Sequence, residues 1–355
     1  MNAVAPIRVA AVRAADLTDR SECVRLDAFV AERPCGTIFH RPAWSRAVAR
    51  GCGQRAHYLV AEQDRRLVGA LPLTEIRSLL FGNALVSAGF GSGGGLLAES
   101  DAVAELLAEA GWELARQLGC PALELRGGRI PAEWTRSEGV YACFDRPLPV
   151  DAEALFTSIP KRQRAEVRRG IDHGLETSAG SDAMHRDALF RAYSESVRNL
   201  GTPIFPRALF EAALDEFGAN ADVVAVWKDG RPLSALLNFY HKGACQPFWG
   251  GGTAEARRWR ANDLVYFDVM KRAIERGCTR ADFGRSKVGT GAWQRKRIWG
   301  FEETPLVYGV RTADGAAPRE INPLNPKYRL QIAVWQRLPL WLANRIGPLI
   351  ARGLG

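Results

Sequence analysis

The chain has 355 residues, of which 47% are hydrophobic and 25% are charged, a composition that fits a globular protein and excludes a disordered one. This length is too great for one ordinary hydrophobic core and suits two domains. The formal net charge of +9 favours a polyanionic partner such as tRNA, a nucleotide-linked sugar or an acidic membrane surface. The alternative is a protein that is basic because it is rich in arginine and that has no polyanionic partner.

The first predicted elements form a hairpin that recurs later in the chain. Its strands are predicted over Ala56–Ala61 and Leu67–Glu75. About 160 residues further on, Val223–Trp227 and Pro232–Tyr240 repeat the pattern around an Asp-Gly pair, which suits the left-handed backbone of a tight turn. The repeat distance is domain-sized and exceeds the periods of roughly 20–50 residues that are typical of solenoids.

A helix and a short strand follow each hairpin. Apolar periodicity predicts helices over Val103–Leu118 and Leu264–Arg276, and short strands over Ala122–Arg126 and Arg280–Gly284. Hairpin, helix and strand in this order are typical of α/β acyltransferases of the GNAT kind. The sequence therefore predicts an α/β fold of two tandem GNAT-like domains related by internal duplication, over residues 1–148 and 149–312, followed by an amphipathic tail over 313–355.

A basic helical segment opens the second domain. Arg164 and Arg168 lie within Lys161–Arg169, where they either bind a diphosphate or tRNA backbone or simply face solvent. Two amphipathic helices are predicted to follow, over Ala188–Leu200 and Arg207–Phe217.

The strands of the second repeat offer candidate groove residues. Asn238 and Tyr240 are two positions apart on one strand, so they share a face and are predicted to line a substrate groove. Trp249 precedes the run Gly250–Gly252. That run either leaves room for an acyl chain or marks a strand end followed by a turn.

The stretch from Asp282 to Glu302 has the most distinctive composition. A strand is predicted to end near Phe283, and Thr290 is predicted to cap a short exposed helix over Gly291–Trp299. Trp293 and Lys296 share one face of that helix. Cations gather near this strand end, where α/β folds collect ligands, and they are Arg285, Lys287, Arg295, Lys296 and Arg297. We therefore expect Arg285, Lys287 and Trp293 to bind substrate, the alternative being a solvated basic helix.

The tail carries Trp335 and Trp341 among aliphatic residues, with arginines between them. This pattern predicts either a peripheral membrane contact or a helix folded back onto the domains. Pro339 and Pro348 are expected to break any long helix.

Two segments are weak candidates for binding the pyrophosphate of acyl-CoA. Arg257–Asn262 precedes a helix but lacks glycines, and Gly91–Gly95 is glycine-rich but lies far before its helix. No G-x-S-x-G motif and no persuasive Ser/His/Asp or Cys/His set is present. This pattern favours direct attack of an amine or hydroxyl on an activated acyl ester, which needs positioning and a positive group at the oxyanion but no enzyme nucleophile.

The cysteines and histidines indicate no metal centre. Seven cysteines without CxxC spacing and five histidines without an HExxH motif predict neither a zinc site nor a disulfide framework. We also identify no signal peptide and no long apolar span, so we expect a cytoplasmic protein, with a peripheral position at the inner membrane as the alternative.

Several motifs together resemble FemAB-related proteins that occur beside exosortase A/PEP-CTERM and exopolysaccharide gene clusters. The central motif is F-G-R-S-K-V-G-T-G-A-W at 283–293, with W-G-F-E-E-T-P-L-V-Y at 299–308. Segments at 67–87, 93–95, 159–175, 198–206 and 325–340 are also similar.

The resemblance implies two GNAT-like domains and transfer of an amino acid from aminoacyl-tRNA onto the amine of a peptidoglycan precursor. It also implies that a lysine steadies the developing negative charge. Lys296 holds the matching position, preceded by Arg295 where the family usually has phenylalanine. In this subgroup the acceptor is expected to be a polysaccharide or its precursor. The alternatives are an acyl-CoA-dependent N- or O-acyltransferase and a non-catalytic scaffold in exopolysaccharide assembly.

Overall fold

The computed structural model describes residues 10–316 and 329–355. Residues 317–328, which belong to the predicted tail and include the first part of the 325–340 motif, lie outside the described residues. The first unit runs from β1 to β7, and its elements are β1 (Ala11–Ala14), α1 (Arg20–Glu32), η1 (Ile38–His40), α2 (Pro42–Cys52), β2 (Arg55–Gln63), β3 (Arg66–Ile76), β4 (Ala84–Ser87), β5 (Leu97–Ala98), α3 (Asp101–Gln117), β6 (Ala122–Arg126) and β7 (Thr135–Pro147).

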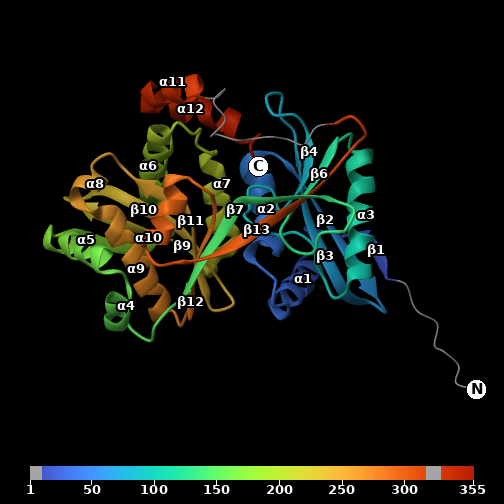
Figure 1. Ribbon diagram of the computed structural model, residues 1–355, viewed down its shortest axis with the longest axis horizontal. Coiled ribbons are helices and arrows are strands. Elements are labelled where there is room, and N and C mark those ends of the chain that lie inside the picture. The colour runs from blue at the N-terminus through green and yellow to red at the C-terminus, as the bar shows by residue number, and fades with distance from the viewer. Residues whose placement is uncertain (1–9, 317–328) are drawn as a thin grey trace, which may run out of the picture.

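The second unit runs from α4 to β13 (Figure 1). Its elements are α4 (Ala152–Ser158), α5 (Lys161–Asp172), β8 (Glu176–Gly180), α6 (Ala183–Leu200), α7 (Arg207–Phe217), η2 (Gly218–Asn220), β9 (Ala221–Lys228), β10 (Arg231–His241), β11 (Ala244–Gly252), α8 (Ala256–Trp259), α9 (Ala261–Glu275), β12 (Arg280–Lys287), α10 (Gly291–Ile298) and β13 (Glu302–Thr312). Two tail helices follow, α11 (Arg329–Arg337) and α12 (Leu340–Ala351).

The two units repeat one order of elements. A strand, two helices, a hairpin, a third strand, a helix and two further strands occur first as β1, α1, α2, β2, β3, β4, α3, β6 and β7. The same order recurs as β8, α6, α7, β9, β10, β11, α9, β12 and β13. The predicted hairpins, helices and strands are therefore confirmed. The pair of helices expected only before the second hairpin also precedes the first, so the repeat is more complete than the sequence indicated.

The hairpin turns are equivalent in backbone conformation as well as in position. Asp229 and Gly230 both have positive φ, and so do Asp64 and Arg65 in the first unit. Two adjacent positive φ values make the tight turn whose twist matches that of its flanking strands.

One 13-stranded sheet runs through both units because they exchange their last strands. The order across the join is β6-β13-β7-β12, so the final strand of each unit pairs with the other unit. Thr312 of β13 pairs with Ala122 of β6, and Arg280 of β12 pairs with Pro147 of β7. The boundary expected after residue 148 follows directly after β7 in the sequence. In the sheet, each unit is completed by a strand from the other.

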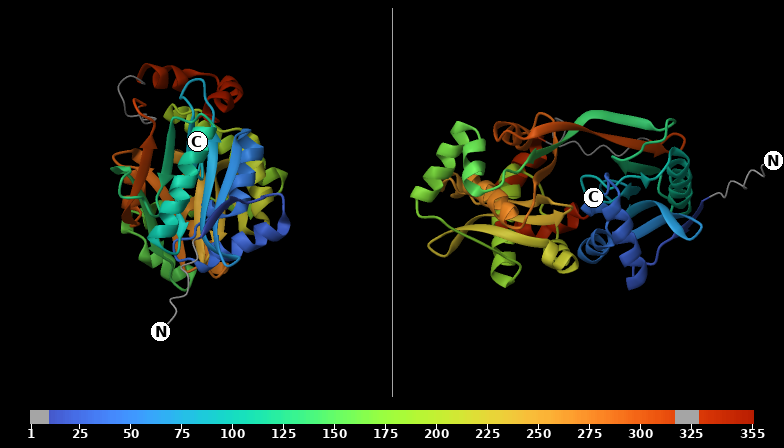
Figure 2. Two further views of the ribbon diagram at one scale, coloured as in Figure 1. Left: turned by 90° about the vertical axis from the view of Figure 1, so that its right-hand side faces the viewer. Right: turned by 90° about the horizontal axis from the view of Figure 1, so that it is seen from below.

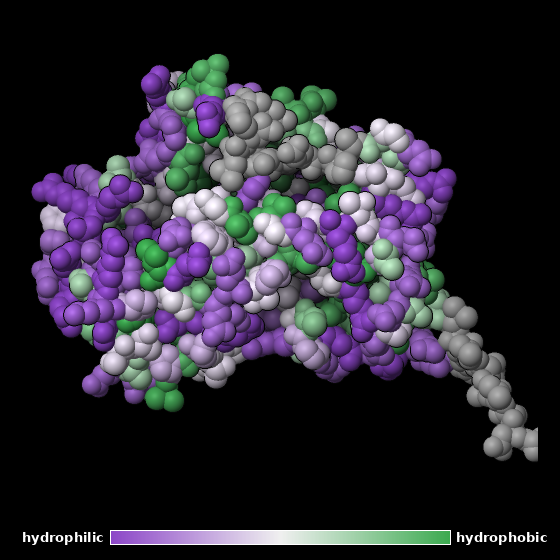
Figure 3. All heavy atoms as spheres, viewed as in Figure 1, coloured by the Kyte–Doolittle hydropathy of each residue, from purple (hydrophilic) through white to green (hydrophobic). Residues whose placement is uncertain are grey.

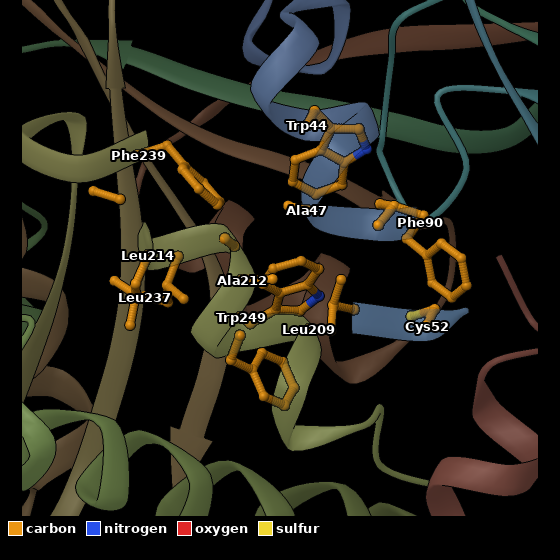
Figure 4. Close-up of a cluster of buried hydrophobic side chains, with 14 of the residues drawn as sticks. Trp44, Ala47, Cys52, Phe90, Leu209, Ala212, Leu214, Leu237, Phe239 and Trp249 are labelled. Atoms are coloured by element: carbon orange, nitrogen blue, oxygen red, sulfur yellow. The ribbon is translucent and has the colours of Figure 1, made fainter. Parts of the chain in front are cut away.

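A shared aromatic core joins the units on one side of the sheet (Figure 4). Trp44 of α2 stacks on Trp249 of β11 with ring centroids 5.4 Å apart, and it meets Phe239 of β10 at 5.9 Å. Helices α2 and α7 approach closely, since a Cβ on Gly51 would lie 2.3 Å from the Leu209 Cα. The units therefore share both a sheet and a core.

The tail folds back onto the second unit and also reaches the first. Pro339 separates α11 from α12 as expected, but Pro348 lies inside α12 and does not end it, a correction to the prediction. Gly347 lies against Ile204, and the Gln54 side chain donates a hydrogen bond of 2.6 Å to the Arg352 carbonyl. Figure 1 and the left view of Figure 2 place the tail helices at one end of the molecule. Across the described ranges, no helix combines the length and apolarity needed to cross a bilayer.

Candidate active site between the two units

A cavity of about 870 Å³, here called the interface cavity, opens where strands of both units meet. Its second-unit wall and the exchanged strands contribute Cys143, Gln246, Asp282, Gly284 and Leu306. Its first-unit wall includes Arg33, Thr37, Phe39, His40, Ser92, Gly93, Gly94, Glu99, Arg126 and Arg129. The cavity therefore depends on both repeats.

The parallel strands β11 and β12 separate beside this cavity. The ladder between β11 and β12 consists of Ala244 with Arg280 and Cys245 with Ala281, and Gln246, the next residue of β11, already lines the cavity. In the first unit, β4 and β6 likewise pair at only two positions. Strand edges that separate in this way expose backbone groups that an extended, amide-bearing ligand can pair with.

Lys296 lies behind the wall of the interface cavity and is not itself one of the lining residues. Thr290 caps α10, its side-chain oxygen accepting a hydrogen bond of 3.3 Å from the Trp293 amide. Lys296 is only 8% exposed although much of its helix faces solvent, which corrects the expectation of a fully exposed helix. Its Nζ donates to the carbonyl oxygens of Gly284 at 3.2 Å and Arg285 at 3.0 Å. Because Gly284 lines the cavity, the ammonium group lies directly behind that wall.

A bulge in β12 places the two carbonyl groups that hold Lys296. Asp282 pairs with Asp145, but Arg285 pairs with Cys143, so β12 contains one extra residue here. Gly284 takes φ +61° at this point, a conformation that glycine adopts at little cost.

Burial sets the electrostatics of this wall. Burial lowers the pKa of Lys296 to about 8, opposed by the nearby Asp282 carboxylate. Burial also raises the pKa of Asp282, while a hydrogen bond of 2.8 Å from the Gly284 amide opposes that rise. The wall thus combines an ammonium group that can stabilise a negative oxygen with a carboxylate that is more basic than usual.

Arg295 faces away from this wall and toward α9. Its guanidinium donates to Asp263 at 3.0 Å and lies 5.0 Å from the centre of the Tyr266 ring. The structure therefore places Lys296, and not its neighbour, beside the cavity.

The first-unit wall is built from a glycine-rich loop and a neutral histidine. The Ser92 hydroxyl is buried without a hydrogen-bond partner and lines the cavity. Burial lowers the pKa of His40 to about 4, so its ring is neutral at physiological pH and bonds the Gly95 carbonyl at 3.1 Å. A Cβ on Gly95 would lie 1.8 Å from the Gly127 carbonyl oxygen, which explains why this loop needs glycine. The run considered above for pyrophosphate lies here, beside the cavity.

Three expected substrate-binding residues lie near Lys296 but do not line the cavity. Arg285 donates to the Tyr308 hydroxyl, and its guanidinium lies 4.7 Å from the centre of the Tyr141 ring. Lys287 is half-buried at the end of β12. Trp293 donates to Glu303 at 2.8 Å and packs, partly buried, against the core of the second unit.

Three others lie in the interior, which corrects the expectation of a groove there. Trp249 is part of the shared aromatic core and is 4% exposed. Asn238 and Tyr240 do share a face, but both donate to Asp222, at 3.2 Å and 3.0 Å. The Asn238 Nδ2 amide and the Tyr240 hydroxyl therefore serve internal hydrogen bonds.

The basic helix α5 lies at the end of the second unit farthest from the first (Figure 1). Arg168 is exposed, with its guanidinium 5.4 Å from the centre of the Phe156 ring, and Arg164 donates to the Thr157 carbonyl at 3.4 Å. Neither residue lines the interface cavity.

One Ser/His/Asp arrangement that the sequence search missed is present on β8 and α6. The Ser178 hydroxyl lies 3.0 Å from His185 Nε2, and His185 Nδ1 lies 3.0 Å from the Asp182 carboxylate. Asp182 also accepts from the His185 amide and caps α6. These residues lie outside the interface cavity, and we interpret them as a helix cap.

Several cavity residues were not singled out from the sequence, namely His40, Ser92, Arg126, Cys143 and Gln246. Ser92 interrupts a glycine run, and this was the one available signal. In residues 10–316 and 329–355, no cluster of three or more His, Cys, Asp or Glu side chains could hold a metal ion.

Comparisons with known proteins agree with this architecture. Residues 161–295 match the family model described as acetyltransferase (GNAT) domain. The structure of FemX has a TM-score of 0.64 at 14% identity, covering 84% of this chain and 96% of that chain. A tandem GNAT protein from the clavulanic acid biosynthesis pathway has a TM-score of 0.56 at 12% identity, covering 87% and 100%.

A third structural neighbour is the C-terminal domain of a putative lysylphosphatidylglycerol synthetase from Agrobacterium fabrum. Its TM-score is 0.54 at 14% identity, covering 82% of this chain and 92% of that chain. A search among curated proteins found no matching sequence. The chain thus has the fold of tandem GNAT proteins, and residues 161–295 of its second unit are similar to the GNAT acetyltransferase domain.

Proposed function

We propose that this protein transfers an acyl or aminoacyl group from an activated donor onto an amine or hydroxyl of a cell-envelope or exopolysaccharide precursor. The observation that carries the proposal is the buried ammonium of Lys296, which bonds the carbonyl of the cavity-lining Gly284 from behind the wall, where β11 and β12 separate. The FemX-like fold supports it, and so do the motifs shared with the exosortase-associated FemAB group.

The reaction proceeds by direct attack, without a covalent enzyme intermediate. The acceptor nitrogen or oxygen bonds to the acyl carbon and the carbonyl becomes an oxyanion, which Lys296 stabilises. The bond to the donor then breaks, releasing a thiol or a ribose hydroxyl. Asp282 accepts the proton from the attacking group, because burial has raised its pKa and it lines the same wall, and it returns that proton to the leaving sulfur or ribose oxygen.

Turnover is expected to fall as the pH rises through about 8. The pKa of Lys296 lies near that value, so the ammonium loses its proton there and the oxyanion loses its positive partner. Lys296→Arg keeps a positive charge to higher pH because a guanidinium remains protonated. The pH profile of kcat for both proteins tests this prediction. An alkaline fall that is identical in Lys296→Arg would assign it to another group.

Variants of the α5 arginines can show whether the donor is aminoacyl-tRNA. A basic surface at this end of the molecule comprises Lys161, Arg162, Arg164, Arg168, Arg169, Arg257 and Arg258. If the donor is aminoacyl-tRNA, Arg164→Ala/Arg168→Ala should raise KM several-fold and flatten its dependence on salt, with little change in kcat. Filter binding of tRNA between 50 and 300 mM salt, roughly bracketing the screening range, measures this directly. Unchanged affinity across salt would leave α5 as a solvated surface.

The acyl-CoA alternative has one specific observation in its favour. Helix α9 begins without a side-chain cap at Arg260, which takes φ +62°, and Arg257 and Arg258 precede it. An uncapped helix start beside arginines suits a pyrophosphate. A thermal shift with acetyl-CoA supports this donor, and one with tRNA supports the first. If the protein neither binds a donor nor transfers a group from one, the non-catalytic scaffold is favoured.

A further inference from the structure

The outward faces of the tail helices carry a regular apolar and basic pattern. Ala343, Gly347 and Ala351 of α12 are buried, each four residues after the last. The opposite side of the helix presents Trp341, 69% exposed, and Leu349, 63% exposed. The exposed arginines on that same side are Arg345 and Arg352. The helix therefore uses one side for packing and leaves the other for water or for a partner.

A loop of the first unit adds two exposed leucines beside these helices. The tip that joins β3 to β4 carries Leu79, which is fully exposed, and Leu80, 70% exposed. A Cβ on Gly353 would lie 2.4 Å from the Ser78 hydroxyl, so the tip meets the end of α12. Figures 1 and 2 show the tip and the tail helices at the same end of the molecule, and Figure 3 shows apolar residues along that edge.

The charge of this end has one sign. Residues 329–355 contain four arginines, Arg329, Arg337, Arg345 and Arg352, and neither aspartate nor glutamate. The loop 77–83 contains no acidic residue, but its Arg77 pairs with Glu75, so the loop contributes apolar surface and no unpaired charge. Exposed leucine and tryptophan among arginines match the boundary of a bilayer with anionic headgroups, where apolar side chains insert and guanidinium groups meet phosphate.

We infer that α11, α12 and the loop 77–83 form one membrane face, which docks the protein on an anionic lipid surface. This inference extends the tail contact expected from the sequence, because it adds an element from the other unit and fixes the orientation. Two elements that are distant in sequence insert together, so neither alone should suffice for stable attachment. The interface cavity lies outside this face, and docking is independent of the reaction proposed above.

Co-sedimentation of the full-length protein with vesicles tests the inference. We expect binding to phosphatidylglycerol/phosphatidylcholine vesicles, weaker binding at high salt, and little binding to pure phosphatidylcholine. Leu79→Ser/Leu80→Ser and Trp341→Ser/Leu349→Ser should each lower the partition coefficient at least about tenfold, since each removes two apolar insertions. All four residues are exposed, so the melting temperature should stay unchanged.

A matched control and a rival occupant complete the design. Val24→Ser removes an equally exposed aliphatic residue from α1, and it should leave vesicle binding unchanged. Lys296→Met should also bind vesicles normally, which separates docking from catalysis. Absence of binding to anionic vesicles overturns the inference, and so does equal loss in Val24→Ser. A dimer in sedimentation velocity that Leu79→Ser/Leu80→Ser dissociates, without vesicle binding, would assign the face to a second copy of the chain.

Discussion

Lys296→Met is expected to lower kcat on the order of 10²–10³-fold while KM stays near its wild-type value. The ammonium group interacts with a full negative charge only after attack, so its loss weakens the transition state more than the bound substrate. Steady-state kinetics with the donor identified by binding measure this effect. Full turnover in Lys296→Met would contradict the role given to the lysine.

The same variant should fold at least as stably as the wild type at neutral pH. Lowering the pKa of Lys296 from 10.5 to about 8 corresponds to about 3 kcal/mol against the charged form. Methionine removes that penalty but leaves two carbonyl groups without their donor, at about 1 kcal/mol each. The unfolded chain binds the proton more tightly between pH 8 and 10.5, so the wild type regains stability over that window as the pH rises. Urea unfolding at neutral and alkaline pH tests this prediction.

Two variants on the same helix are controls for the loss of positive charge. Arg297→Met removes an exposed guanidinium that stacks on Trp293, and it should leave turnover within about threefold. Arg295→Phe restores the residue usual in the family but leaves the half-buried Asp263 without its partner. It should therefore destabilise the fold and spare kcat. Loss of turnover in Arg295→Phe alone would move the catalytic role to that arginine.

Trp44→Ala should destabilise the whole chain by about 3–5 kcal/mol. Trp44 is 1% exposed and packs against both units, so the cavity left by its removal weakens their common core. The exchanged strands β7 and β13 link the units further. We therefore expect one cooperative transition in wild type and variant, with coincident urea curves from tryptophan fluorescence and far-UV circular dichroism.

Trp341→Ala is the matched control, because it removes an indole that is 69% exposed. Its cost should stay within about 0.5 kcal/mol. Two separate transitions, of which Trp44→Ala shifts only one, would show that the units unfold independently and that the shared core contributes little.

Local signals in the sequence predicted the repeated elements well. The Asp-Gly pair at 229–230 specified a turn that needs positive φ, and Thr290 specified a helix start through its side-chain oxygen. Such signals depend on a few adjacent residues. The turn and the helix start could therefore be predicted without knowing the rest of the fold.

Long-range pairing was not readable in the same way. Nothing in the residues of β6 indicates that its neighbour is β13, because the choice depends on how two distant strands fit between the units. Asn238 and Tyr240 were correctly given one face, but strand periodicity does not say whether that face meets a groove or a core. Trp249 was proposed because glycines follow it, and those glycines do not indicate that its side chain packs in the shared core.

In the candidate site, too, local signals were recognised and long-range contacts were not. The cationic segment after Asp282 was recognised, but the burial of Lys296 follows from the bulge at Gly284, which only the pairing of β12 with β7 creates. In the first-unit wall only the glycine run 91–95 was singled out, and its place opposite Asp282 was not predicted because the two segments lie far apart in sequence. When a site lies between two repeats, any one stretch of the chain contains only some of its lining residues.

Co-crystallisation with a hydrolysis-resistant donor analogue, acyl-CoA or aminoacyl-nucleoside according to which one binds, tests the central claim most directly. The account predicts the donor between the separated edges of β11 and β12, its acyl carbonyl oxygen within hydrogen-bond distance of Lys296 Nζ, and open cavity toward Ser92 and Gly93 for the acceptor. A donor bound between β4 and β6 of the first unit, with Lys296 still bonded only to the Gly284 and Arg285 carbonyls, would contradict it.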